Sequence, residues 1–180
     1  MPGEAWISTS MPYLRPTAGG QGDVWGQEAA ARGRRGTQRI VGAGEVPASD
    51  VVARLLGLAE GEAVVVRRRI ILLDEQPCEL TDSYYPARIA AGTALAGTAK
   101  IRGGAVSLLA ELGYVGRRVQ EDVAARMPTE EERELLRTGV DEPVLRLERV
   151  LLDGGERPIQ VDLITMPAHR QRLRYELTMG

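Results

Sequence analysis

The sequence predicts an α+β fold, with a mostly antiparallel sheet of about six strands and helices packed on it. Three observations support this prediction. Long stretches rich in valine, leucine and isoleucine are separated by short turns, as in β-hairpins. Short stretches with helical apolar spacing and capping residues lie between them. One β-α-β-β pattern also occurs twice, about 80 residues apart.

The composition is that of a globular protein of ordinary size. The 180 residues are 43% hydrophobic and 27% charged, with a formal net charge of −2, which argues against a basic nucleic-acid surface. Cys78 is the single cysteine, so no internal disulfide can form, which fits a reducing compartment. No apolar run approaches the ~20 residues that span a bilayer. We therefore expect a cytoplasmic protein without a membrane segment.

The chain is expected to divide at residue 23. Residues 1–22 are rich in proline, glycine, serine and threonine, which predicts a linker or tail without a core of its own. The alanine-rich segment that follows predicts a short helix from about Gly26, ending at Gly33. Residues 23–180 are predicted to form one domain.

The first copy of the repeat covers residues 37–86. Residues 37–47 alternate loosely and predict a strand. The amphipathic segment after them predicts a helix with Ser49 as N-cap and Gly57 at its end. The apolar run that follows, a turn at residues 74–77 and a further polar-apolar stretch predict a β-hairpin.

The second copy begins with a strand predicted over residues 115–128. Thr129 as N-cap, with Glu132 three residues later, predicts a helix with a capping box that ends at Gly139. Residues 142–167 then predict a second long hairpin. Each copy therefore has a strand, a capped helix and a hairpin.

Three segments lie outside the repeat. Residues 87–103 predict a loop with one helical turn, and residues 104–114 predict a helix packed on the sheet. Residues 172–177 predict a last short strand. Two β-α-β-β halves leave a cleft where they meet, which is a preferred place for a small ligand.

The run "VVVRRRIILL" places three arginines inside a strand that otherwise has a buried composition. Because side chains alternate along a strand, Arg67 and Arg69 share one face and Arg68 lies on the other. Two guanidinium groups on one face can hold an anion. They can equally form an ion pair with Glu79 of the next strand, and the pattern leaves both interpretations open.

The repeat distinguishes the two arginines on the shared face. Arg69 aligns with Arg149 of the second copy, which favours a partly architectural role for it. Arg67 aligns with Leu147, so it has no charged counterpart. Arg67 is therefore predicted to have the more ligand-specific role.

Signals of catalysis are weak. His169 is the single histidine, so the sequence predicts neither a Cys/His metal cluster nor a Cys–His catalytic pair. A nucleophile elbow, a Walker-type loop and a Rossmann fingerprint are all missing. The helix that opens near Trp25 adds an anion signal, because free backbone N–H groups favour a phosphate or carboxylate. We expect no catalytic residue, no metal and no cofactor.

The sequence resembles the UTRA effector-binding domain of GntR-type transcription regulators, in the histidine-utilisation-repressor subfamily. The segments that carry the resemblance are "PASDVVARLLGLAEGEAVVVRRRIILLDEQPCELTDSYYP", "RMPTEEERELLRTG" and "PVLRLERVLLDGGERPIQVD". The resemblance implies a chorismate-lyase-like fold, a homodimer and a small anionic metabolite as effector. DNA is then bound only through an N-terminal winged helix-turn-helix, which this chain lacks.

The same resemblance gives a set of candidate ligand-binding residues. Arg67 and Arg69 are expected to hold the anionic group, and Glu79 and Gln160 to contact hydroxyls. Gly104 and Gln160 depart from the serine and glutamate that sugar-phosphate sensors tend to carry, which favours an anion over a particular sugar. The full set is Arg67, Arg69, Glu79, Trp25, Gly26, Gln27, Ser83, Tyr85, Gly104 and Gln160.

Two other functions stay open at this point. One is a chorismate-lyase-like enzyme on the same fold, although no acid–base pair suited to that reaction stands out in the sequence. The other is a stand-alone UTRA protein that acts by heterodimerisation with a full-length relative. The leading hypothesis is an effector-sensing domain without enzymatic activity.

Overall fold

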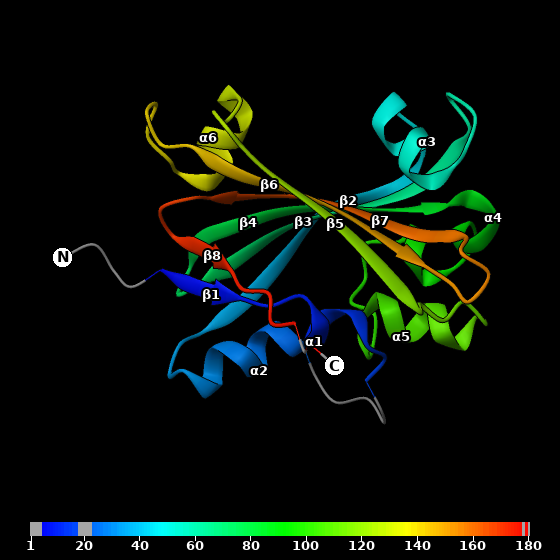
Figure 1. Ribbon diagram of the computed structural model, residues 1–180, viewed down its shortest axis with the longest axis horizontal. Coiled ribbons are helices and arrows are strands. Elements are labelled where there is room, and N and C mark those ends of the chain that lie inside the picture. Colours follow the sequence, from blue (N-terminus) through cyan, green and yellow to red (C-terminus); the bar gives the residue numbers. More distant parts are fainter. Residues whose placement is uncertain (1–4, 18–22, 178, 180) are drawn as a thin grey trace.

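The computed structural model describes residues 5–17, 23–177 and 179. Its main element is a six-stranded sheet with the strand order β2-β3-β4-β7-β6-β5 (Figure 1). Every neighbouring pair in this sheet is antiparallel. The predicted α+β fold is therefore confirmed. The strands are β2 (Gly36–Pro47), β3 (Ala63–Leu73), β4 (Gln76–Pro86), β5 (Arg118–Arg126), β6 (Val144–Leu152) and β7 (Pro158–Pro167).

The sheet consists of two halves with the same order of elements. The first half is β2, α3 (Asp50–Leu56), β3 and β4, and the second is β5, α6 (Glu130–Leu136), β6 and β7. The last strands of the two halves, β4 and β7, pair with each other in the middle of the sheet. The predicted β-α-β-β repeat is confirmed, and its halves meet at the centre of the molecule.

Both repeated helices begin where the sequence predicts. The Ser49 side chain accepts a hydrogen bond at the start of α3, and Thr129 forms a reciprocal capping box with Glu132 at the start of α6. The end of α6 differs from the prediction. The helix ends at Arg137, which has the left-handed conformation with φ 53°, two residues before the predicted end at Gly139.

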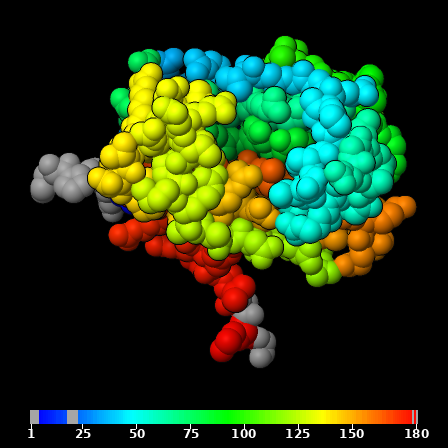
Figure 2. Space-filling model, turned by 90° about the horizontal axis from the view of Figure 1, so that it is seen from above, coloured from blue at the N-terminus to red at the C-terminus, as the bar shows by residue number. Residues whose placement is uncertain are grey.

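The two faces of the sheet carry different elements (Figure 1). On one face, α3 and α6 flank a hollow, which Figure 2 shows between the cyan and yellow regions. On the other face lie α1 (Met11–Leu14), α2 (Val24–Ala31) and α5 (Gly104–Glu111). Near them, β1 (Trp6–Ser8) pairs in parallel with β8 (Gln171–Leu173).

Apolar side chains hold the helices on both faces. Under α5, Tyr85 and Leu95 are buried in one cluster with Leu109. On the opposite face, Val52 of α3 packs in a cluster with Val161 of β7. These clusters fix the sheet between the two helical layers and leave room for a cavity on the α2 and α5 side.

Residues 6–17 are not the coreless linker that the sequence predicts. Trp6 and Leu14 are 5% and 8% exposed, so both belong to the core. The Trp6 ring meets the Trp25 ring edge to face, with 5.0 Å between centroids. The proline- and serine-rich composition of this segment concealed its two large apolar anchors. Residues 6–17 are called the N-terminal arm below.

Smaller differences concern the ends of elements. Helix α2 begins at Val24 rather than near Gly26. The predicted loop after β4 contains α4 (Ala87–Ala90) and a 3₁₀ turn, η2 (Ala94–Ala96). Within the described residues, no helix is long and apolar enough to span a membrane.

Candidate functional site

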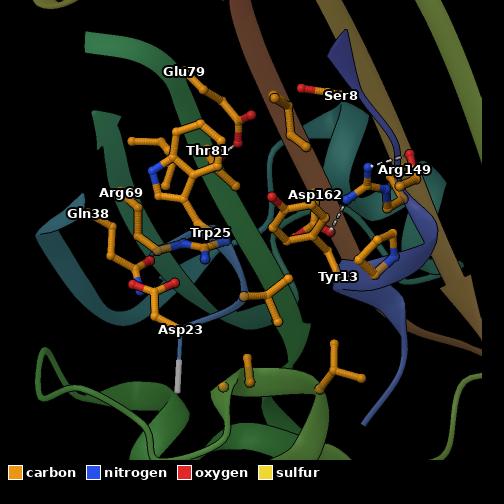
Figure 3. A pocket seen from close by; sticks show the side chains of 18 of the residues that line it. Ser8, Tyr13, Asp23, Trp25, Gln38, Arg69, Glu79, Thr81, Arg149 and Asp162 are labelled. Carbon is orange, nitrogen blue, oxygen red and sulfur yellow. Dashed lines mark hydrogen bonds and ion pairs between the residues drawn. The ribbon is translucent and has the colours of Figure 1, made fainter. Parts of the chain in front are cut away.

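A cavity of about 500 Å³ lies between the sheet and the elements on its α2 and α5 side (Figure 3). Side chains of β3, β4, β6 and β7 form its floor. The N-terminal arm and the starts of α2 and α5 form its walls. Both halves of the sheet contribute, as expected for a cleft where they meet. The volume suits a small metabolite.

A row of polar residues crosses the sheet because these residues are cross-strand partners. In order from β3 to β5, the partners are Arg67, Ser83, Asp162, Arg149 and Glu121. Cross-strand partners share a face, so the row lies on the cavity side of the sheet. The charged side chains of this row are therefore on the same side of the sheet as the cavity.

Asp162 is the centre of this row. Its carboxylate accepts hydrogen bonds from Ser83 Oγ at 2.5 Å and from Gln160 Nε2 at 2.9 Å. Arg149 Nη1 lies 3.8 Å from Asp162 Oδ2, and Arg149 Nε lies 2.6 Å from Glu121 Oε1. Two carboxylates thus compensate the charge of Arg149, and it has little to offer a ligand.

Arg67 does not line the cavity, which corrects the expectation that it faces a ligand. Its side chain is 4% exposed. Nη1 donates to the carbonyl groups of Ala94 at 3.0 Å and of Gly97, and Nη2 donates to the carbonyl of Ala99 at 3.1 Å. Arg67 therefore holds the loop around η2 on the sheet. The sequence carried no sign that this loop presents its carbonyl groups inward.

Arg69 does line the cavity. Its Nη2 donates to Ser83 Oγ at 3.0 Å, whereas its buried Nε has no hydrogen-bond partner among the described residues. It also forms no ion pair within that part of the chain, so the intra-sheet pair with Glu79 is not formed. The two halves of the repeat differ at this point. Arg149 has Glu121 of β5 as its cross-strand partner, whereas the corresponding partner of Arg69 is the apolar Ile40 of β2.

The start of α2 contributes Trp25 to the cavity wall. The Trp25 indole Nε1 donates to the carbonyl of Leu72 at 2.9 Å, which fixes the ring against β3. Gly26 and Gln27 do not line the cavity. The Gln27 backbone N–H donates to the Asp23 carbonyl at 3.0 Å, because the helix begins earlier than predicted.

The start of α5 also faces the cavity. Gly103 and Gly104 have φ values of +77° and +84°, which glycine adopts without strain. The first turn of a helix has backbone N–H groups without intrahelical partners, so this end favours negative charge. Lys100 and Arg102 line the cavity beside it and add positive charge.

Further polar groups lie along the floor. Glu79 accepts a hydrogen bond from Thr81 Oγ1, and burial raises the pKa of the Glu79 carboxyl. Burial also raises the pKa of Tyr85 to about 12, so its hydroxyl stays protonated at neutral pH. Gln160 is 5% exposed, and its Oε1 has no hydrogen-bond partner among the described residues.

The structure thus brings together only part of the set expected from the sequence. The residues of that set that line the cavity are Trp25, Arg69, Glu79, Tyr85, Gly104 and Gln160. Ser83 lies under the floor, where it connects Arg69 with Asp162. The residues that lie elsewhere are Arg67, Gly26 and Gln27.

Sequence reasoning missed several contributions to the cavity, among them Lys100 and Arg102. Asp162 was detectable, because it follows Gln160 by two residues on the same strand face. Gln38 of β2 lines the cavity but has no distinguishing pattern. The N-terminal arm contributes Ser10 and Tyr13, which its composition concealed.

The described residues contain no group of three or more His, Cys, Asp and Glu side chains placed to hold a metal ion. The cavity instead offers Arg69, which forms no ion pair among the described residues, together with Lys100, Arg102, two helix starts and several hydrogen-bonding side chains. Such a lining is suited to binding a small polar molecule.

The UTRA domain family matches residues 31–172. A curated relative, an uncharacterized HTH-type transcriptional regulator of Streptomyces coelicolor, is 34% identical over 125 residues. That match covers 67% of this chain and 46% of the relative. The chain therefore spans about half the length of that relative.

Two solved structures have the same fold. The effector domain of PhnF from Mycobacterium smegmatis has a TM-score of 0.73 at 20% identity, covering 86% of this chain and 94% of that chain. The C-terminal domain of the histidine utilization repressor from Pseudomonas syringae pv. tomato has a TM-score of 0.69 at 22% identity. That match covers 81% of this chain and 100% of that chain. Since the family match extends over most of the sheet and its helices, the chain belongs to the UTRA domain family.

Proposed function

We propose that this UTRA domain is the sensor of a GntR-type transcription regulator and binds a small anionic metabolite in the cavity beside Arg69. The observation that carries the proposal is Arg69, which lines the cavity and forms no ion pair among the described residues. The start of α5, with Lys100 and Arg102, favours negative charge in the same cavity, whereas the start of α2 places the Asp23 carboxylate there. The relatives are transcriptional regulators or parts of them, which supports a regulatory role over an enzymatic one.

The N-terminal arm is the element whose arrangement can change when a ligand binds, because it forms one wall of the cavity. Ser10 Oγ accepts a hydrogen bond from Arg149 Nη2 at 2.9 Å. Thr17 is bound to the start of α5, through its N–H to Ser107 Oγ at 3.0 Å and its Oγ1 to the Gly103 carbonyl at 3.1 Å. A ligand that touches floor and wall favours one arrangement of the arm, which shifts the population of states.

The proposed regulator is a cytoplasmic homodimer that binds DNA through a winged helix-turn-helix outside this chain. The homodimer is supported by the resemblance to the histidine-utilisation-repressor subfamily. The net charge of −2 supports a domain that does not bind DNA itself, because DNA binding relies on lysine and arginine contacts to phosphate. Sedimentation velocity on the chain measures whether two copies associate.

The proposal is tested by a thermal-shift screen of phosphorylated and carboxylated metabolites. A ligand at 100 times its Kd stabilises the folded state by about 2.7 kcal/mol. Arg69→Gln removes a charge-assisted contact of about 1.5–3 kcal/mol, so it should weaken binding of the best anion by about 10- to 150-fold. Ile40→Glu should weaken it as well, because the new carboxylate pairs with Arg69.

The matched control is Arg68→Gln. Arg68 lies on the opposite face of the same strand and pairs with Asp82 at 3.4 Å, so this variant should bind the anion like the wild type. Unchanged affinity in both Arg69→Gln and Ile40→Glu contradicts the proposed site.

A further inference from the structure

We propose that the effector is dipolar: besides the anionic group held at Arg69, it carries an ammonium group that binds at Glu79. This inference rests on the proposed anion site and adds a second charge to it. The ligand class is therefore an amine-bearing phosphate or carboxylate, rather than an anion alone.

The first argument is the Glu79 carboxylate, which contacts none of the cations that line the cavity closely enough to form an ion pair among the described residues. Glu79 lines the same cavity as Arg69. Its carboxylate accepts a hydrogen bond from Thr81 Oγ1 and forms no ion pair among the described residues. Glu79 is half-buried, and desolvation raises the pKa of its carboxyl although the Thr81 hydrogen bond and the charges of Arg69 and Arg149 lower it, so a further cation in contact would stabilise the charged form. An ammonium group from outside supplies that cation.

The second argument is that the two unpaired charges are held apart by the sheet. Arg69 is the partner of Thr81, and Ile71 is the partner of Glu79, so Arg69 and Glu79 are diagonal neighbours on one face. Such neighbours lie about 7–8 Å apart. Arg69 leans toward Ser83, which lies on the far side of Thr81 from Glu79. A small molecule with both charges can reach both side chains.

The third argument is the aromatic lining at the Glu79 end. Trp25 packs in one cluster with Ile71, and Tyr13 packs against that cluster. Both aromatic side chains also line the cavity, and Figure 3 shows Trp25 between Glu79 and Arg69 in this view. A carboxylate beside aromatic rings is a favourable environment for an ammonium group, since the rings attract cations. A neutral hydroxyl would leave the charge of Glu79 uncompensated.

A further polar group lies on the other side of Arg69. The buried Oε1 of Gln160 has no hydrogen-bond partner among the described residues, so it can accept an N–H or O–H of the ligand. The cavity therefore offers Arg69 in the middle, Glu79 at one end and Gln160 at the other.

The test uses three small probes at neutral pH, with binding measured by calorimetry. Phosphoethanolamine carries both charges, ethyl phosphate only the anion and ethanolamine only the cation. We expect phosphoethanolamine to bind the wild type about 10-fold more tightly than ethyl phosphate. Glu79→Gln should remove that advantage without weakening ethyl phosphate. The pair β-alanine and propionate repeats the comparison with a carboxylate and separates the two anion types.

The control variant is Asp82→Asn, a carboxylate on the same strand but on the opposite face, which should keep the wild-type preference. The thermal midpoint of the unliganded Glu79→Gln variant verifies that it folds. Equal affinities of the wild type for phosphoethanolamine and ethyl phosphate overturn the inference, as does an unchanged preference in Glu79→Gln. If neither binds at millimolar concentration, the proposed anion site itself is contradicted.

Discussion

Arg67 and Arg69 share a strand face, yet they have different partners. Arg67 donates to backbone carbonyl groups around η2, whereas Arg69 lines the cavity and forms no ion pair within the described part of the chain. Strand alternation predicted the shared face correctly. It could not predict the difference, because this depends on a loop about 30 residues away in the sequence whose carbonyl groups turn inward.

Replacement of Arg67 should destabilise the fold rather than act only on ligand binding. Arg67→Met keeps the bulk of the side chain but removes the donor from three partly buried carbonyl groups, those of Ala94, Gly97 and Ala99. A buried group left unsatisfied costs about 1–3 kcal/mol, so a loss of about this size is expected in urea unfolding for the three partly buried groups together. Arg68→Met, at an exposed position on the other face, should change stability much less. Equal losses in the two variants contradict the structural role of Arg67.

The candidate residues on β4 show what strand alternation predicts about a binding site and what it does not. Glu79 and Tyr85 alternate along β4 on one face, and both line the cavity. Ser83 has the same parity but lies under Arg69. The sequence thus indicates the face of a residue, whereas its depth depends on the side chains packed above it.

At the scale of elements, the start of α6 is stabilised by the capping box that its sequence predicts. Glu132 accepts a hydrogen bond from the Thr129 N–H at 2.9 Å, completing the capping box. The same carboxylate accepts two hydrogen bonds from the Arg126 guanidinium, each at 2.7 Å. The capping box was predictable from local spacing, but the contact with Arg126 required β5 to end beside the helix.

These contacts make the stability of the protein depend on pH. Hydrogen bonds from Arg126 hold the pKa of Glu132 at about 2, below its usual value of 4.5. A lowered pKa contributes stability above the unfolded-state pKa, and this contribution is lost as the pH falls from about 4.5 toward 2. Glu132→Gln should therefore reduce the free energy of unfolding by roughly 1 kcal/mol at neutral pH.

The measurement is the difference in free energy of unfolding between the wild type and Glu132→Gln at several pH values. This difference should shrink as the pH is lowered from about 5 to 3, where the unfolded chain becomes protonated. Glu131→Gln, at an exposed first-turn position, serves as the control and should show a much smaller change. A difference that does not vary with pH contradicts the account of Glu132.

The N-terminal arm is the element that the sequence concealed most completely. Its composition is typical of a linker, but Trp6 and Leu14 are buried and Ser10 contacts Arg149. Two apolar anchors in a short segment give no periodic pattern. Trp6 is buried against Trp25 and Ala29 of α2, whereas Leu14 is buried in the cluster under α5, and both surfaces appear only in the folded molecule.

At the scale of the whole molecule, one plan is used twice with one difference in charge. Arg149 and Arg69 occupy equivalent positions in the two halves. Glu121 compensates Arg149, whereas Ile40 stands at the corresponding place beside Arg69. The repeat was visible in the sequence, but this asymmetry required the register of both outer strands. As a result Arg69, unlike Arg149, forms no ion pair with the residues that the structure describes.

The central claim is that an anion binds beside Arg69 and that the arm responds to it. Hydrogen–deuterium exchange with and without saturating inorganic phosphate tests both parts at once. In the wild type, phosphate should slow exchange in the N-terminal arm and at the starts of α2 and α5, because a bound ligand stabilises the structure around it. In Arg69→Gln the protection should disappear. The account is contradicted if phosphate leaves exchange in these segments unchanged in the wild type. It is also contradicted if phosphate slows exchange equally in Arg69→Gln.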